Sequence, residues 1–65
     1  MTIYKVQLMR DGKPDGVEEN MQAPTEKGAA ERIVGRILFK QGLSENIRAL
    51  VRTSSNERQT VFYER

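Results

Sequence analysis

One stretch of the sequence has the period of an amphipathic helix, and it constrains the fold more than any other feature. Pro24 and Thr25 open it, with Thr25 as the N-cap, and Gly42 is expected to end it in the left-handed conformation. A lone helix with one apolar stripe covers one face of a sheet and leaves the other face open. The stripe follows the i, i+3, i+4, i+7, i+8 spacing and consists of Ala30, Ile33, Val34, Ile37 and Leu38.

The segments around this helix predict β-structure. Two Asp-Gly pairs in residues 11–16 indicate a turn, and residues 54–58 indicate a second loop. The sequence therefore predicts a single α+β domain over residues 1–65. We expect a two-layer ββαββ domain, with one helix packed on one face of a four-stranded, mainly antiparallel sheet. The predicted strands alternate apolar and polar side chains or are rich in β-forming residues, and they are residues 2–10, 17–23, 46–53 and 59–64.

The composition excludes several kinds of chemistry. The chain has 65 residues and contains neither His nor Cys, which excludes zinc fingers, disulfide frameworks and the Ser-His-Asp and Cys-His nucleophilic sites. The loop from Asp11 to Gly16 has Lys13 where a calcium loop of the EF-hand type needs an oxygen ligand, so we interpret it as a plain turn. Since so short a chain seldom encloses a deep pocket, we expect no enzyme, no cofactor and no metal site.

The apolar runs of the sequence bear on its location. None is longer than three residues, so the sequence predicts no membrane-spanning segment. The absence of Cys fits a reducing compartment, and we expect a cytoplasmic protein.

Basic charge is concentrated in the second half of the chain. Residues 1–31 hold four basic and six acidic side chains, whereas residues 32–65 hold seven basic and three acidic ones. Arg32, Arg36 and Lys40 are spaced i, i+4, i+8, which on a continuous helix forms one row beside the apolar stripe. Such a row occurs on phosphate-contacting surfaces, but a charged row is more often a solvated helix flank.

The predicted open face of the sheet carries both apolar and basic side chains. The alternation in residues 46–53 places Leu50 on this face together with Arg48 and Arg52. Met9 and Phe62 are expected to join them. An apolar patch with arginines at its rim is typical of a protein interface, although single exposed apolar residues are normal on any protein.

Phe39 is a second candidate for an interface. It falls nearly opposite the apolar stripe of the helix, so it is either exposed or bent over the helix end onto the last strand.

These patterns lead to two functional hypotheses. The first is a small non-enzymatic binding, adaptor or regulatory protein that docks a protein partner or a second copy of itself, as a dimer. The second is an accessory RNA- or DNA-binding protein, although one nucleic-acid strand would have to wrap an edge of the domain to touch both the helix and the open face. The residues for the first are Leu50, Arg48, Arg52, Met9, Phe62 and Phe39, and for the second Arg32, Arg36, Lys40, Arg48 and Arg52.

Overall fold

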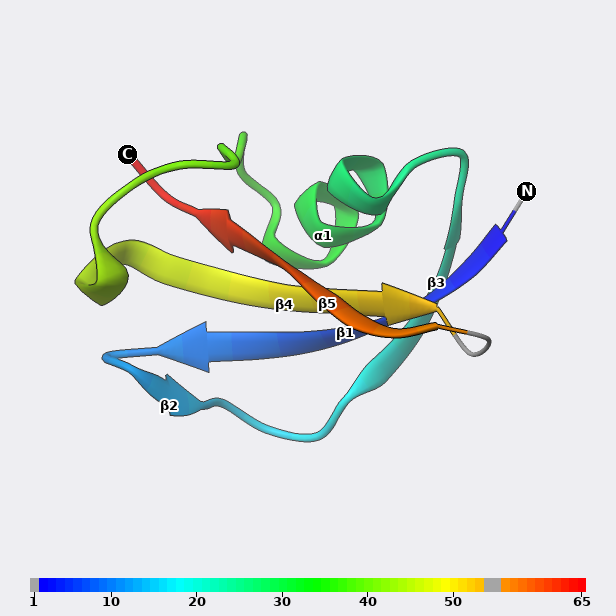
Figure 1. The fold of residues 1–65 in the computed structure, drawn as a ribbon, viewed down its shortest axis with the longest axis horizontal. Coiled ribbons are helices and arrows are strands. Elements are labelled where there is room, and N and C mark those ends of the chain that lie inside the picture. Colours follow the sequence, from blue (N-terminus) through cyan, green and yellow to red (C-terminus); the bar gives the residue numbers. More distant parts are fainter. Residues whose placement is uncertain (1, 54–55) are drawn as a thin grey trace.

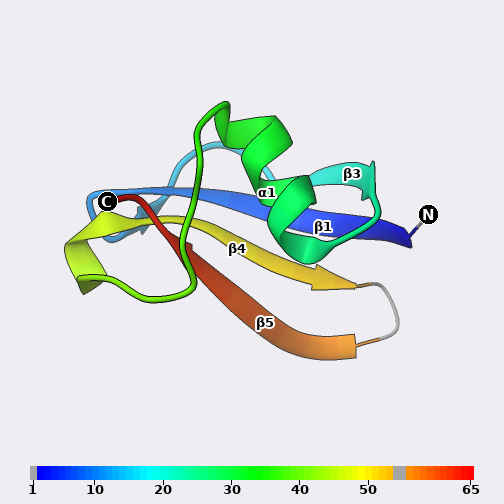
Figure 2. The ribbon, with the colours of Figure 1, turned by 90° about the horizontal axis from the view of Figure 1, so that it is seen from above.

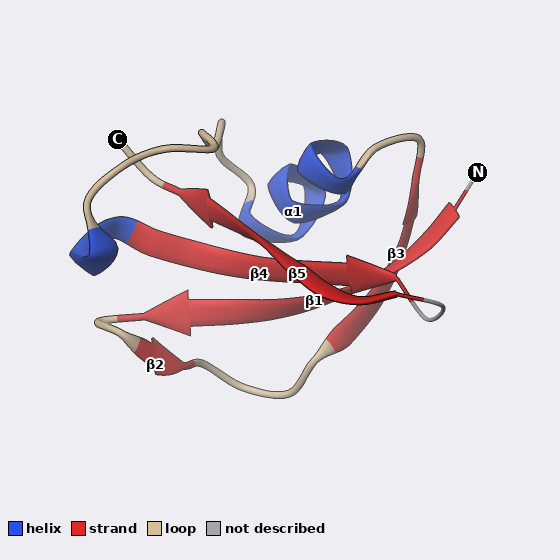
Figure 3. Ribbon diagram, viewed as in Figure 1, coloured by secondary structure: helices blue, strands red, loops and turns tan. Residues whose placement is uncertain are grey.

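The computed structural model of the chain describes residues 2–53 and 56–65. Figure 3 shows a sheet with one α-helix and a short 3-10 helix in this part of the chain. The α+β class is confirmed, and the ββαββ order is confirmed in outline. The second predicted strand, residues 17–23, corresponds to β3, and an additional two-residue strand, β2, lies within the predicted turn at residues 11–16, so the sheet has five strands rather than four. In chain order the elements are β1 (Thr2–Arg10), β2 (Lys13–Pro14), β3 (Glu19–Ala23), α1 (Glu26–Val34), η1 (Ser44–Asn46), β4 (Ile47–Thr53) and β5 (Asn56–Tyr63).

β1 lies in the middle of the sheet (Figure 1). It pairs antiparallel with β2 and β3 at different points along its length, and with β4 on its other side, while β4 also pairs with β5. The turn between β1 and β2 is the predicted one. Asp11 and Gly12 both have positive φ, 52° and 77°, which is the signature of the type I′ turn that Asp-Gly favours.

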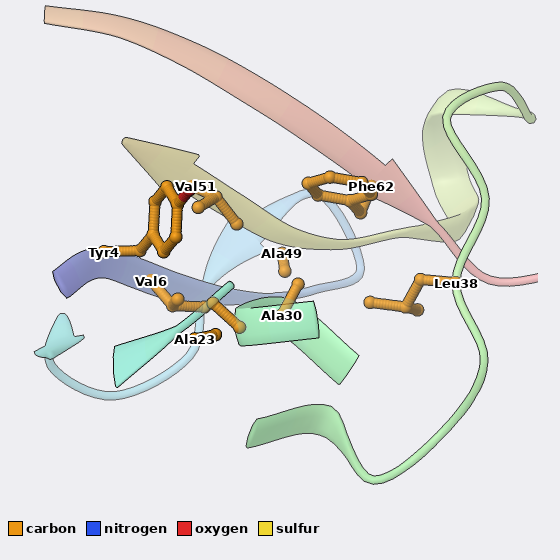
Figure 4. Close-up of a cluster of buried hydrophobic side chains, with 9 residues drawn as sticks. Tyr4, Val6, Ala23, Ala30, Leu38, Ala49, Val51 and Phe62 are labelled. Carbon is orange, nitrogen blue, oxygen red and sulfur yellow. The ribbon is translucent and has the colours of Figure 1, made fainter. Parts of the chain in front are cut away.

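The core lies between α1 and the face of the sheet formed by β1, β3 and β4 (Figure 4). Four of its side chains are alanines, and its largest fully buried members are Phe62, Leu38, Val6 and Val51. Val6 and Val51 lie opposite each other on β1 and β4. Among the described residues the buried hydrophobic side chains are Tyr4, Val6, Ala23, Ala29, Ala30, Leu38, Ala49, Val51 and Phe62.

The start of the helix is as predicted, but its end is not. The Thr25 side chain accepts a hydrogen bond of 3.0 Å from the Gly28 N–H, as an N-cap does. The helix ends at Val34 rather than near Gly42. Gly35 takes the left-handed conformation, with φ 79°, and its N–H donates to the Glu31 carbonyl at 2.8 Å.

Gly42 has a different role from the predicted one. A Cβ at this position would lie 2.8 Å from the Cβ of Tyr63, so glycine lets the chain pass close to the last strand. Residues 35–43 therefore form a connecting loop between α1 and η1, which Figure 2 shows crossing over the end of β5. The last two residues of the predicted stripe belong to this loop: Leu38 is fully buried, whereas Ile37 is 71% exposed.

Candidate functional site

The side of the sheet opposite α1 carries the predicted binding surface. Directly opposed residues of antiparallel strands share a face, and Gln7, Leu50 and Val61 are opposed in turn across β1, β4 and β5. We call this surface the open face. By the strand alternation against the buried Val6 and Val51, it consists of Ile3, Lys5, Gln7, Leu50, Arg52 and Val61.

The structure changes two members of the predicted set. Phe62 is not on the open face, because it is fully buried opposite Ala49. Val61 is on this face, and the sequence analysis missed it. The pairs Leu50–Val61 and Ala49–Phe62 are consecutive, so Phe62 faces the core because it alternates with Val61 along β5. A register shift of β4 lies beyond these pairs, between Ile47 and Ala49.

Met9 follows the alternation of β1 onto the same side of the sheet and is half-buried. It lies at the end of the strand, beside the turn to β2, where it pairs with Pro14. Met9 lies farther along β1 than Gln7, the residue opposite Leu50, so it is at the periphery of the predicted surface.

Arg52 lies on the open face, as predicted, and is held by a carboxylate. Its Nη2 is 3.0 Å from Oε1 of Glu18, and its Nε donates to Oε2 at 3.1 Å. This two-point contact lowers the pKa of Glu18 below its ordinary value, chiefly through the hydrogen bond from Arg52. Lys5 lies opposite Arg52 on β1, so Glu18 also offsets two neighbouring positive charges.

Arg48 does not join Arg52. It is the extra residue at the register shift of β4, and such bulges turn a side chain away from its regular direction. Its Nε donates to Oε2 of Glu64 at 2.6 Å, and its Nη1 donates to the carbonyls of Glu45 and Ile47 at 3.3 and 3.1 Å.

Arg36 pairs with the other oxygen of the same Glu64 carboxylate. Hydrogen bonds from Arg48 first, and then from Arg36, hold the pKa of Glu64 below its ordinary value. The three side chains line a hollow of about 490 Å³ beyond the C-terminal end of α1, together with Leu8, Met9, Arg10, Asp11, Asp15, Ile33 and Val34.

The prediction of a basic row on the helix is wrong, because α1 ends at Val34, before Arg36 and Lys40. Arg32 lies in the last turn of α1, where its Nη1 donates to the Gln22 carbonyl at 2.9 Å. Arg36 and Lys40 lie beyond the helix, in the connecting loop. Nucleic-acid binding itself stays a prediction, but the arrangement that suggested it is not present.

Phe39 is bent onto the last strand, which is one of its two predicted positions. Its backbone exchanges two hydrogen bonds of 2.8 Å with Tyr63. The guanidinium of Arg65 lies 5.6 Å from the centre of its ring, within the range of a cation–π contact. Phe39 also lines a second hollow, of about 590 Å³, which we call the loop hollow and which is formed by Phe39, Lys40, Gln41, Gly42, Leu43, Asn46, Glu64 and Arg65.

Within residues 2–53 and 56–65, no three or more acidic, His or Cys side chains gather as a metal site would require. No helix in these ranges has the length and apolar character needed to cross a membrane.

Comparison with known proteins gives no relative: no family model matches the chain, and no curated protein or solved structure matches it significantly. The function is therefore inferred from the geometry described above.

Proposed function

We propose that this protein is a small non-enzymatic binding protein that self-associates through its open face. The observation that supports this most is the position of Leu50 and Val61, which are opposed across β4 and β5 on the side of the sheet that α1 does not cover. Gln7, which is neutral, lies opposite Leu50 on β1. Both Leu50 and Val61 are half-buried. Two adjoining apolar side chains on a sheet face that no helix covers are a typical centre for an interface.

The small core gives a second argument. It consists largely of alanine and valine, and a domain of this size buries only about 60% of the surface of its unfolded chain. The accessible surface is 4665 Å², whereas a folded monomer of 7.5 kDa is expected to have about 4,250 Å². Burial of the open face in a dimer would add apolar contact that the isolated domain lacks.

A second copy of the chain is the partner that best fits this face. An interface around a two-fold axis near Leu50 and Val61 lays the apolar centre of one copy on that of the other. Such an arrangement keeps the charged side chains of the face, Lys5 and Arg52, away from the axis. The negative charge of Glu18 beside Arg52 further reduces repulsion between two copies.

The test is the solution mass of matched variants, measured by light scattering over a range of protein concentrations. We expect wild-type protein to be a dimer and Leu50→Asp to be a monomer, because a carboxylate at the centre of the interface would be buried without a partner. Ile37→Asp is the matched control. It places the same charge on an exposed apolar residue of the connecting loop, and it should remain a dimer.

A second variant separates loss of the dimer from loss of folding. Val61→Thr preserves the shape and the strand preference of the side chain, so the fold should be retained and the dimer weakened. Circular dichroism reports the folding of each variant. A wild-type chain that stays monomeric up to about 1 mM contradicts the proposal, since that concentration would reveal even a dissociation constant in the millimolar range.

A further inference from the structure

The connecting loop displays an unusual amount of apolar surface. Among the described residues five large apolar side chains are exposed, and three of them lie in this loop: Ile37 at 71%, Phe39 at 36% and Leu43 at 63%. Phe39 and Leu43 line the loop hollow. This surface is separate from the open face, which is formed by β1, β4 and β5.

The loop is held in place by specific contacts. Leu38 is buried in the core, and its N–H donates to Oε2 of Glu31 at 2.8 Å. Phe39 pairs with Tyr63, and the Asn46 N–H donates to the Leu43 carbonyl at 2.8 Å. The exposed side chains of Phe39 and Leu43 are therefore carried on ordered backbone, which lowers the entropy lost when a partner binds.

The loop hollow has two basic side chains and one acidic side chain in its lining. Lys40 and Arg65 both line it, and within the described part of the chain neither forms an ion pair with a carboxylate side chain. Glu64 is the acidic residue at the hollow, and Arg36 and Arg48 already neutralise it. The hollow thus combines an apolar wall with two available cations.

We infer that the loop hollow docks a segment of a partner protein in which an aliphatic or aromatic side chain lies next to an acidic one. The apolar side chain of the segment packs against Phe39 and Leu43, and its carboxylate pairs with Lys40 and Arg65. The guanidinium of Arg65 keeps its planar fork available for a carboxylate while it lies over the Phe39 ring. Charge complementarity favours an acidic segment over a basic one, and the size of the hollow matches a few side chains of a peptide.

The experiment uses a fluorescein-labelled decapeptide in which Glu and Asp alternate with Leu and Phe, and binding is followed by fluorescence anisotropy. Two matched peptides carry Gln and Asn in place of the acids, or Ser in place of Leu and Phe. We expect the first peptide to bind wild-type protein and each matched peptide to bind about tenfold more weakly, since each loses one of the two kinds of contact. Lys40→Glu and Leu43→Ser should each weaken the first peptide by a similar factor.

Val17→Ser is the control variant, because Val17 is exposed but lies outside both the loop hollow and the open face, and it should bind the peptide as wild type does. Absence of binding to wild-type protein, or equal binding by Lys40→Glu, contradicts the inference. Binding to phosphatidylserine-containing vesicles without binding to the peptide also contradicts it, because the surface would then recognise lipid. The solution mass of Leu43→Ser distinguishes the two proposals, since it should match wild type whether or not the peptide binds.

Discussion

The layer above the sheet has two halves that cover it in different ways (Figure 2). The first half is α1, a regular helix that places Ala29 and Ala30 against the sheet. The second half is the connecting loop, which is fixed by one buried side chain, Leu38, and by its contacts with β5. The helix gains its position from repeated small contacts, whereas the loop depends on a few single residues. A loop held in this way leaves its other side chains free to face solvent.

The largest expected effect comes from the buried side chain of the loop. Leu38→Ala removes a fully buried leucine and should lower the free energy of unfolding by about 2–5 kcal/mol. A domain of this length has a total of roughly 3–10 kcal/mol, so the variant should be partly or wholly unfolded. Urea denaturation followed by circular dichroism measures the change. Ile37→Ala, at the exposed neighbouring position, should cost less than about 0.5 kcal/mol. Equal losses for the two variants would show that the loop does not depend on Leu38.

Two glycines at the ends of this loop are expected to resist substitution for different reasons. Gly42→Ala brings a Cβ against Tyr63 and should cost about 1–3 kcal/mol through overpacking. Gly35→Ala has open space around it but keeps a positive φ, and should cost about 1 kcal/mol. Asn separates the two causes. It tolerates the left-handed conformation and should be accepted at Gly35, whereas at Gly42 it should be at least as harmful as Ala. Thermal unfolding of the four variants gives the order, and acceptance of Asn at Gly42 would contradict the close approach to Tyr63.

The smallest expected effect concerns the acid sensitivity of Glu64, which joins the connecting loop to β4 through its ion pairs with Arg36 and Arg48. The pKa of Glu64 is lower in the folded chain than its ordinary value of 4.5, because Arg48 and Arg36 stabilise the carboxylate. The contribution of Glu64 to stability is therefore fully present above about pH 4.5 and is lost as the pH falls through the lower, folded pKa. Urea midpoints of wild type and Glu64→Gln should differ at neutral pH and converge as the pH is lowered below 4.5 and through the folded pKa of Glu64. A constant difference between the two proteins across this range would mean that Glu64 does not titrate with folding.

The sequence predicted the regular half of this layer and not the irregular half. Thr25 as the helix N-cap and the Asp11-Gly12 turn follow from local backbone chemistry, and both were predicted. The predicted end of the helix was wrong because Ile37 and Leu38 continue the apolar spacing of the helix beyond Gly35. Leu38 is buried in the core and bonded to Glu31, whereas Ile37 is exposed, and no local pattern contains this difference.

The candidate surface was predicted in part for a similar reason. Leu50 and Arg52 lie on the open face because β4 alternates regularly over Ala49–Val51. Arg48 was misplaced because it is the extra residue at a register shift of β4. Phe62 was misplaced because the face that it shares is known only once β5 is paired with β4. A shift of this kind is set by the pairing of two strands, so it cannot be seen in either strand alone.

The central position of β1 has a consequence for synthesis of the chain. β1 leaves the ribosome before β4, with which it pairs: Tyr4 lies opposite Thr53 and Leu8 lies opposite Ala49. Until residues 47–53 emerge, β1 has only the nearby β2, β3 and α1 as partners, and the edge that pairs with β4 remains unpaired. Long-range pairing of this kind delays folding, so the nascent chain exposes this edge of β1 until β4 has emerged.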